Sequence, residues 1–290
     1  MSLVEQAIAR MRNQARAAAP TAAHTTTIPV APPVVGQVHD LVGKSAKAMT
    51  LNMDALRARG YLPEVSKDQQ FADHYRRIKR PLIDRAMSGV TAVGQPNLIM
   101  ITSALPGDGK TFTSINLALS MALERDISVL LVDCDVAKQH VSDIFGIRSE
   151  GGLLDALVDD AADVDSLVLQ TNLRGLSILP AGRRVEATAE LLSSNRMRQI
   201  VTHLCRNPRR IVLLDSPPLL LTNEGRTLVK LAGQIALVVR AGHTPRQAVQ
   251  DAIGLFDVQQ TGGIILNQVN VSGEDGYYGY GSYETYRNAP

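Results

Sequence analysis

Residues 97–111 read Asn-Leu-Ile-Met-Ile-Thr-Ser-Ala-Leu-Pro-Gly-Asp-Gly-Lys-Thr, and this stretch decides the fold. Residues 98–101 form an apolar run of strand length, residues 104–111 follow the pattern A-x-x-x-x-G-K-T, and a helical pattern begins at Phe112. A strand, a glycine-containing loop and a helix in this order are the context that a phosphate-binding loop requires. The alternative, a glycine turn with a surface lysine, does not account for the flanking strand and helix.

The chemistry of this loop is specific. Gly107 and Gly109 let the backbone curl so that successive N–H groups point inward, and the following helix adds the positive end of its dipole. Lys110 supplies a full charge for the outer phosphates, and the Thr111 hydroxyl is a magnesium ligand. The strict pattern begins with glycine, but alanine tolerates right-handed or extended backbone, so we expect a variant loop. The candidate nucleotide-binding residues are Ala104, Leu105, Pro106, Gly107, Asp108, Gly109, Lys110, Thr111 and Phe112.

The composition sets limits on the rest of the chain. Its 290 residues, 45% of them hydrophobic, have room for one large α/β domain with extensions. A formal charge of +2 does not favour nucleic acid as a partner, and two cysteines suggest a reducing compartment. We see no secretory signal and no apolar run near the ~18 residues of a membrane span. We therefore expect a cytoplasmic protein.

Strands and helices alternate after residue 97. Short apolar runs without polar alternation indicate strands that are buried on both faces of a parallel sheet. They lie at 98–101, 128–132, 176–179, 211–214, 235–239 and 263–266. The predicted helices between them span 112–125, 187–206, 224–230 and 244–256. The pattern predicts an α/β fold, a doubly wound and mostly parallel sheet with helices on both faces.

The chain divides into four predicted parts. Residues 1–18 are an N-terminal helix candidate, and residues 19–66 are a linker and weakly ordered region that includes a weak helix pattern over 40–60. Residues 67–271 form the main domain, which starts with a helix over 67–87. Residues 272–290 form a tail that cannot bury a core. The tail holds five of the seven tyrosines: Tyr277, Tyr278, Tyr280, Tyr283 and Tyr286.

Acidic side chains follow two of the predicted strands. Asp215 ends Ile-Val-Leu-Leu-Asp-Ser-Pro-Pro, and Asp133 and Asp135 end Val-Leu-Leu-Val-Asp-Cys-Asp. Ligands sit at the carboxyl ends of strands in such sheets, so we expect these carboxylates to hold a metal or take a proton. An N-cap is the alternative for Asp215. The prolines after it favour a fixed loop instead.

Three segments, 105–111, 129–135 and 211–218, resemble the Walker A, A′ and B motifs of the bacterial tyrosine kinases, which are P-loop enzymes. The resemblance covers residue 67 to the C-terminus, and the tail is similar to the family's autophosphorylation cluster. The N-terminal helix and linker resemble the exosortase-associated branch, which is linked to exopolysaccharide production. Two departures are visible. The family's Asp-x-Asp is followed two residues on by an arginine, where this chain has Ala137, with Lys138 next. The family's ring-forming oligomerisation motif, Glu-x-x-Arg-x-x-Arg, appears as Asp73, Arg76 and Lys79, for which a solvated helix face is the alternative.

The resemblance implies ATP and Mg²⁺ as cofactors and roles for named residues. Lys110 and the loop amides would hold the phosphates, while Thr111, Asp135 and Asp215 would hold magnesium. Asp133 would deprotonate the tyrosine hydroxyl, which makes Lys110, Asp133 and Asp135 the catalytic candidates. Asn267 resembles an adenine-contacting asparagine of the superfamily, and a turn residue is the alternative reading.

The same resemblance implies partners. We expect a homo-oligomer, in this family a ring, in which one subunit's tail enters the neighbouring site. Phosphorylation would then open the oligomer, because each phosphate adds about −1.5 to −2 charges. A membrane-embedded activator of the polysaccharide chain-length or export type would bring the protein to the inner membrane.

Two other functions compete with the kinase. A partitioning or septum-positioning ATPase of the ParA/MinD kind would carry a second lysine early in the loop, where this chain has Leu105 and Pro106. A nucleotide-dependent scaffold would bind ATP without modifying its tail.

Overall fold

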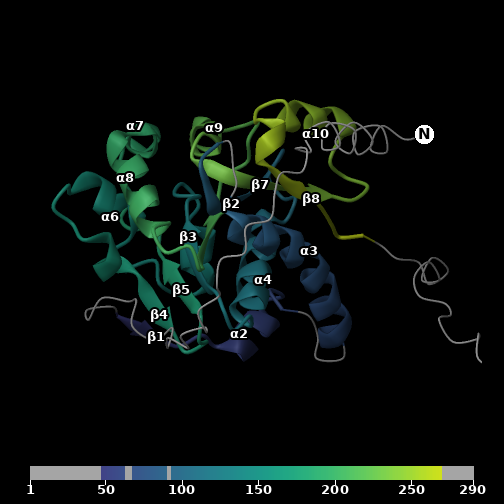
Figure 1. Ribbon diagram of the computed structural model, residues 1–290, viewed down its shortest axis with the longest axis horizontal. Coiled ribbons are helices and arrows are strands. Elements are labelled where there is room, and N and C mark those ends of the chain that lie inside the picture. Colours follow the sequence, from purple (N-terminus) through teal and green to yellow (C-terminus); the bar gives the residue numbers. More distant parts are fainter. Residues whose placement is uncertain (1–46, 63–66, 90–92, 270–290) are drawn as a thin grey trace, which may run out of the picture. The chain divides into compact units, whose positions relative to one another are not determined.

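An eight-stranded sheet forms the centre of the structure, a computed structural model that describes residues 47–62, 67–89 and 93–269 (Figure 1). These residues belong to one unit that begins at Asp40. The predicted N-terminal helix and the tyrosine-rich tail lie outside the described residues. None of the described helices is long and apolar enough to cross a membrane.

The sheet has the predicted, mostly parallel arrangement. Its order is β1 (Ala48–Met49), β4 (Leu169–Thr171), β5 (Leu176–Leu179), β3 (Ser128–Asp133), β6 (Arg210–Asp215), β2 (Gln95–Ser103), β7 (Ala232–Arg240) and β8 (Thr261–Asn267). Every neighbouring pair is parallel except β4 and β5. All six predicted strands are present. The sequence did not reveal β1 and β4, whose two and three residues are too few for a pattern.

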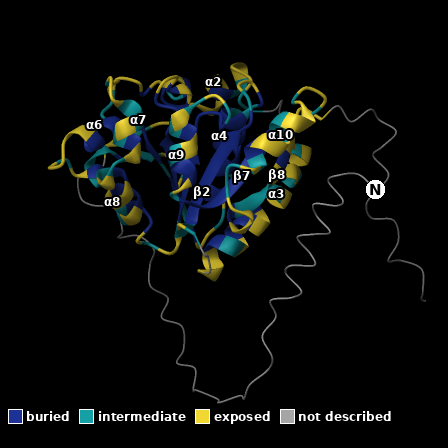
Figure 2. Cartoon of the chain, turned by 90° about the horizontal axis from the view of Figure 1, so that it is seen from above, coloured by how far each residue is buried: buried dark blue, intermediate teal, exposed yellow. Residues whose placement is uncertain are grey.

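Helices cover both faces of the sheet. They are α2 (Met53–Ala58), α3 (Asp68–Ser88), α4 (Lys110–Ala122), α5 (His140–Ile144), α6 (Leu153–Val158), α7 (Thr188–Ser193), α8 (Asn195–Leu204), α9 (Asn223–Val229) and α10 (Arg246–Ile253). Two short 3₁₀ turns, η2 (Val164–Leu167) and η3 (Val258–Gln260), complete the described elements. Figure 2 shows the strands and α4 as buried, whereas outer helices such as α8 and α10 carry exposed residues.

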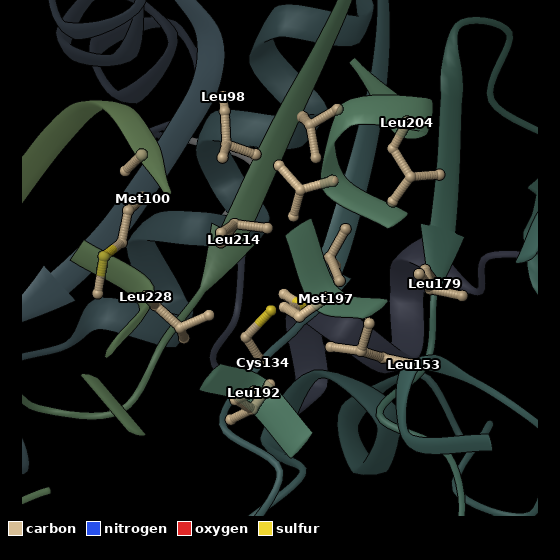
Figure 3. Close-up of a cluster of buried hydrophobic side chains, with 14 of the residues drawn as sticks. Leu98, Met100, Cys134, Leu153, Leu179, Leu192, Met197, Leu204, Leu214 and Leu228 are labelled. Atoms are coloured by element: carbon tan, nitrogen blue, oxygen red, sulfur yellow. The ribbon is translucent and has the colours of Figure 1, made fainter. Parts of the chain in front are cut away.

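Successive residues of β2 show why the strand sequence is continuously apolar. Leu98 and Met100 pack into the core beneath α6 to α10, part of which is drawn in Figure 3. Ile99 and Ile101 pack into the second core, beneath α3 and α4. All four side chains are fully buried. A central strand that is covered on both faces has no residue facing solvent, so polar residues do not alternate with the apolar ones.

Two predictions about the helices were wrong in part. The predicted helix over 187–206 is broken at Ser194, whose backbone is extended and whose hydroxyl caps α8 by accepting from the Met197 N–H at 3.1 Å. In the described part of the weak helix expected over 40–60, only the six residues of α2 are helical. Leu51 and Leu56 are buried in the core, and β1 pairs with β4. The end of the predicted linker is therefore part of the folded unit.

The predicted oligomerisation motif lies on α3, and its members differ in exposure. Asp73 is half-buried and Arg76 is exposed, and the two form an ion pair with each other. Lys79 is only 6% exposed, and its ammonium group binds the Ser120 carbonyl at 2.6 Å and the Glu124 carboxylate at 2.9 Å. Lys79 therefore holds α3 against α4 within the chain. Oligomerisation through Asp73 and Arg76 stays a prediction.

Candidate active site

The predicted site residues gather at the carboxyl edge of the sheet because of the strand order. Strand β6 lies between β3 and β2, with Asp133 and Asp215 paired in register and Ile101 paired with Asp215. The loop that follows β2 begins at the same edge. Both aspartates therefore lie on the same side of the molecule as the phosphate-binding loop.

The loop has the backbone that its glycines predicted. Gly107 and Gly109 have φ angles of 87° and 95°, in the left-handed region, and α4 begins at Lys110. Among described residues other than glycine, only Gln139 and Gln268 have positive φ, so Ala104 has an ordinary backbone. A side chain at Gly109 would collide with Asn267, since its Cβ would lie 2.0 Å from Nδ2.

Lys110 is held within a group of buried carboxylates. Its Nζ lies 2.7 Å from Asp135 Oδ2, and both side chains are largely buried. Burial by itself would lower the pKa of Lys110, but the charges of the three site aspartates outweigh burial and raise the pKa. The ammonium group is therefore charged and fixed at the start of α4, where a phosphate would bind.

Asp215 binds two hydroxyls from α4. Its Oδ2 accepts from Thr111 Oγ1 at 2.9 Å, and its Oδ1 accepts from Ser114 Oγ at 2.9 Å. Burial raises the pKa of this carboxyl, while Lys110 and the two hydroxyls oppose the rise. The carboxylate therefore contacts α4 and does not cap a helix of its own. Sequence analysis missed Ser114, although its spacing of three from Thr111 puts both on one face of a helix.

Asp133 is the carboxylate best suited to receive a proton. Its Oδ2 accepts from the N–H and the hydroxyl of Ser142, at 2.8 and 2.7 Å, while Oδ1 is buried without a hydrogen-bond partner among the described residues. Burial, and then the charge of Asp215, raise the pKa of Asp133 to about 7. The two hydrogen bonds from Ser142 act in the opposite direction and lower the pKa. Sequence analysis missed Ser142, which is nine residues away on α5.

The oxygen donors of the site fit Mg²⁺. Thr111 and Asp215 are hydrogen-bonded to each other, and Asp135 accepts from the Lys110 ammonium group. Within the described residues, no three His, Cys, Asp or Glu side chains are placed to hold a metal ion. Mg²⁺ usually takes only one or two protein carboxylates and completes its shell with water and substrate phosphates, so this sparse set is suitable.

Asn267 contacts the phosphate-binding loop. Its Nδ2 donates to the Asp108 carbonyl at 3.0 Å, and the Asp108 carboxylate accepts from Thr244 Oγ1 at 2.7 Å and from the Leu105 N–H at 3.3 Å. The ends of β7 and β8 are thereby joined to the loop. Sequence analysis missed Thr244. The adenine contact of Asn267 stays a prediction.

Replacing Thr244 with valine is expected to lower the free energy of unfolding by about 1–3 kcal/mol, because an oxygen of the buried Asp108 carboxylate loses its donor. ADP should also bind more weakly, since the loop loses its attachment to β7. Chemical denaturation and calorimetric titration measure the two effects. Thr227→Val, which removes a hydroxyl from α9, is the control, and equal losses in both variants would contradict the role of Thr244.

A cavity of about 210 Å³ opens beside the acidic group. Its walls include Pro106 from the phosphate-binding loop, Pro217, Pro218 and Leu221 from the segment after β6, and Asp135 and Lys138 from the loop after β3. The cavity is therefore mostly apolar, with the carboxylates of Asp135 and Glu224 in its lining.

Comparisons with known proteins agree with this geometry. The family model described as "AAA domain" matches residues 97–243. The tyrosine-protein kinase YwqD of Bacillus subtilis is 30% identical over 221 residues, which are 75% of this chain and 88% of YwqD. The kinase domain of the Escherichia coli tyrosine kinase ETK superposes with a TM-score of 0.56 at 28% identity and covers 64% of this chain and 72% of that domain.

Other relatives are much longer than this chain. The tyrosine-protein kinase Wzc of Salmonella typhimurium is 30% identical over 192 residues, which are 66% of this chain but 26% of Wzc. The chain therefore spans about a quarter of the length of this relative.

Proposed function

The chain belongs to the bacterial tyrosine kinases of the P-loop superfamily, and from this membership we propose that it phosphorylates tyrosines of its own C-terminal segment with ATP. The observation that carries the proposal is the convergence of Lys110, Asp135, Asp215 and Asp133 at one edge of the sheet beside a cavity. Phosphoryl transfer depends mainly on positioning and charge neutralisation, and these side chains supply both.

The contacts support the following roles. Lys110 and the loop N–H groups bind and orient the β- and γ-phosphates, and Asp135 holds the ammonium group in place. Thr111, Asp215 and Asp135 would hold Mg²⁺, which supplies neutralisation of the phosphate charge. The tyrosine oxygen forms a bond to the γ-phosphorus as the bond to the bridging oxygen of ADP breaks. The phenol proton passes to Asp133, whose free Oδ1 can accept it.

The apolar cavity supports a tyrosine as the acceptor. Pro106, Pro217, Pro218 and Leu221 offer surfaces against which a phenol ring packs, while its hydroxyl end faces Asp135. The phosphate-binding loop and the loop of Asp135 both line the cavity. The proposed acceptor site therefore lies beside the loop that would hold the donor nucleotide.

The oligomer, the activating partner and the cellular process are proposed only because the sequence resembles this kinase family. The tail is phosphorylated in trans within a homo-oligomer, and a membrane-embedded partner activates the kinase at the inner membrane. The process it serves is exopolysaccharide production.

Incubating the purified full chain with ATP and Mg²⁺ tests the activity. Mass spectrometry should find phosphate on Tyr277, Tyr278, Tyr280, Tyr283 or Tyr286, and replacing all five with phenylalanine should remove the signal. A switch ATPase or a scaffold would hydrolyse or bind ATP and leave these tyrosines unmodified. An unmodified tail in the presence of the activating partner would refute the kinase.

A further inference from the structure

Three cationic side chains meet at the loop that follows Asp135. The Arg184 guanidinium donates to the Ala137 carbonyl at 2.6 Å, and the Arg148 guanidinium donates to the Lys138 carbonyl at 3.0 Å. Lys138 is therefore flanked by two arginines, of which Arg184 comes from a segment that is distant in sequence. All three cationic side chains are exposed. We call Lys138, Arg148 and Arg184 the basic cluster.

The positive charge of the basic cluster is only partly neutralised. Arg148 has the Asp143 carboxylate at 3.5 Å. Within the described part of the chain, no carboxylate lies within 4.0 Å of the charged nitrogens of Lys138 or Arg184. The neighbouring Arg183 is already paired with Asp155 at 2.6 Å, so it adds little.

The basic cluster borders the proposed acceptor site. Ala137 and Lys138 line the same cavity as Asp135 and the prolines, and Glu224 is the other carboxylate in its lining. A peptide whose tyrosine enters this cavity therefore has its neighbouring residues close to Lys138 and to Arg184, which binds the carbonyl of the cavity-lining Ala137. Such residues would bind most favourably if they carried negative charge.

We propose that the basic cluster binds carboxylates next to the acceptor tyrosine, so that the kinase selects tyrosines in acidic sequence. This inference rests on the proposed function. The ligand is the tail itself, in which Glu274 and Asp275 precede Tyr277, and Glu284 follows Tyr283. In an extended peptide, two residues span about 7 Å, which lets Asp275 reach the cavity rim while Tyr277 is inside. The charges of the cluster and of these flanking residues are complementary.

A peptide of residues 272–290 tests the selection with the full chain as enzyme, its own five tail tyrosines replaced by phenylalanine. The second peptide carries Glu274→Gln, Asp275→Asn and Glu284→Gln. We expect its KM to be about five- to tenfold higher and its kcat to be unchanged, because each exposed ion pair contributes only about 1.4- to 5-fold in affinity. The difference should shrink in high salt.

Enzyme variants locate the effect. Lys138→Ala with Arg184→Ala should raise KM for the native peptide and leave KM for the neutral peptide nearly unchanged. Arg206→Ala with Arg209→Ala removes two exposed cations near the amino end of β6 and is the matched control. Arg184→Lys keeps the charge but not the fork that binds the Ala137 carbonyl, so it should retain most of the selectivity.

Equal KM values for the two peptides would overturn this inference and leave the kinase intact. The inference would also be overturned if the control variant reduced selectivity as much as the Lys138 and Arg184 variant. The preference for acidic peptides would then come from the net charge of the protein. If neither peptide is phosphorylated, the proposed function fails, and this inference fails with it.

Discussion

Replacing Lys110 with methionine should reduce tail phosphorylation by roughly a thousandfold or more, the range seen when one cation is removed from a phosphoryl-transfer site. Methionine has similar length but no charge, so the γ-phosphate loses its fixed cation. Asp135 also loses its partner at 2.7 Å. Quantitative anti-phosphotyrosine detection after ATP addition measures the loss.

The control for this variant is Lys230→Met, which removes an exposed lysine at the end of α9. It should keep full activity. The Lys110 variant should in addition be less stable near pH 8, because three buried carboxylates lose their shared counterion. Tail phosphorylation that survives in the Lys110 variant would show that another group binds the phosphates, and the proposed site would be wrong.

Replacing Asp133 with asparagine should separate activity from stability. Asparagine keeps the shape of the side chain but cannot take a proton, so tail phosphorylation should fall by about 10²- to 10⁴-fold. ATP binding should persist, because Lys110 and the loop are intact. Nucleotide titration and phosphorylation assays on the same preparation distinguish these two effects.

The same variant should be more stable than the unaltered protein at pH 8 by about 1–3 kcal/mol. Asp133 has a folded pKa of about 7, above its ordinary value of 3.8, so the folded state binds this proton more tightly than the unfolded state. Its contribution to stability is therefore present below about pH 4 and is lost as the pH rises to about 7. Asparagine does not titrate and avoids this loss.

Urea unfolding at pH 5 and pH 8, without nucleotide, measures this effect. The gain from Asp133→Asn should be larger at pH 8. The control is Asp126→Asn at an exposed position, which should change stability little at either pH. A variant that is less stable at pH 8 would mean that the bonds from Ser142 outweigh the cost of the buried charge.

The local elements of this protein could be predicted from its sequence. The apolar run at 98–101, the two glycines and the helix after Lys110 are each encoded by neighbouring residues, and the structure confirms them. The other five predicted strands are also present, because a strand covered on both faces needs a continuous apolar run. The aspartates that end β3 and β6 could be found because each directly follows such an apolar run.

The partners of these residues were decided only by the tertiary structure. Strand order places β6 between β3 and β2, and no local pattern encodes it. The hydroxyls of Ser142 and Thr244 are ordinary in sequence and become relevant only because folding places them against Asp133 and Asp108. The sequence placed Lys79 in the oligomerisation motif, whereas in the structure its ammonium group binds Glu124 and the Ser120 carbonyl. Side-chain environments depend on contacts between residues far apart in the chain, whereas strands, turns and helices depend largely on neighbours.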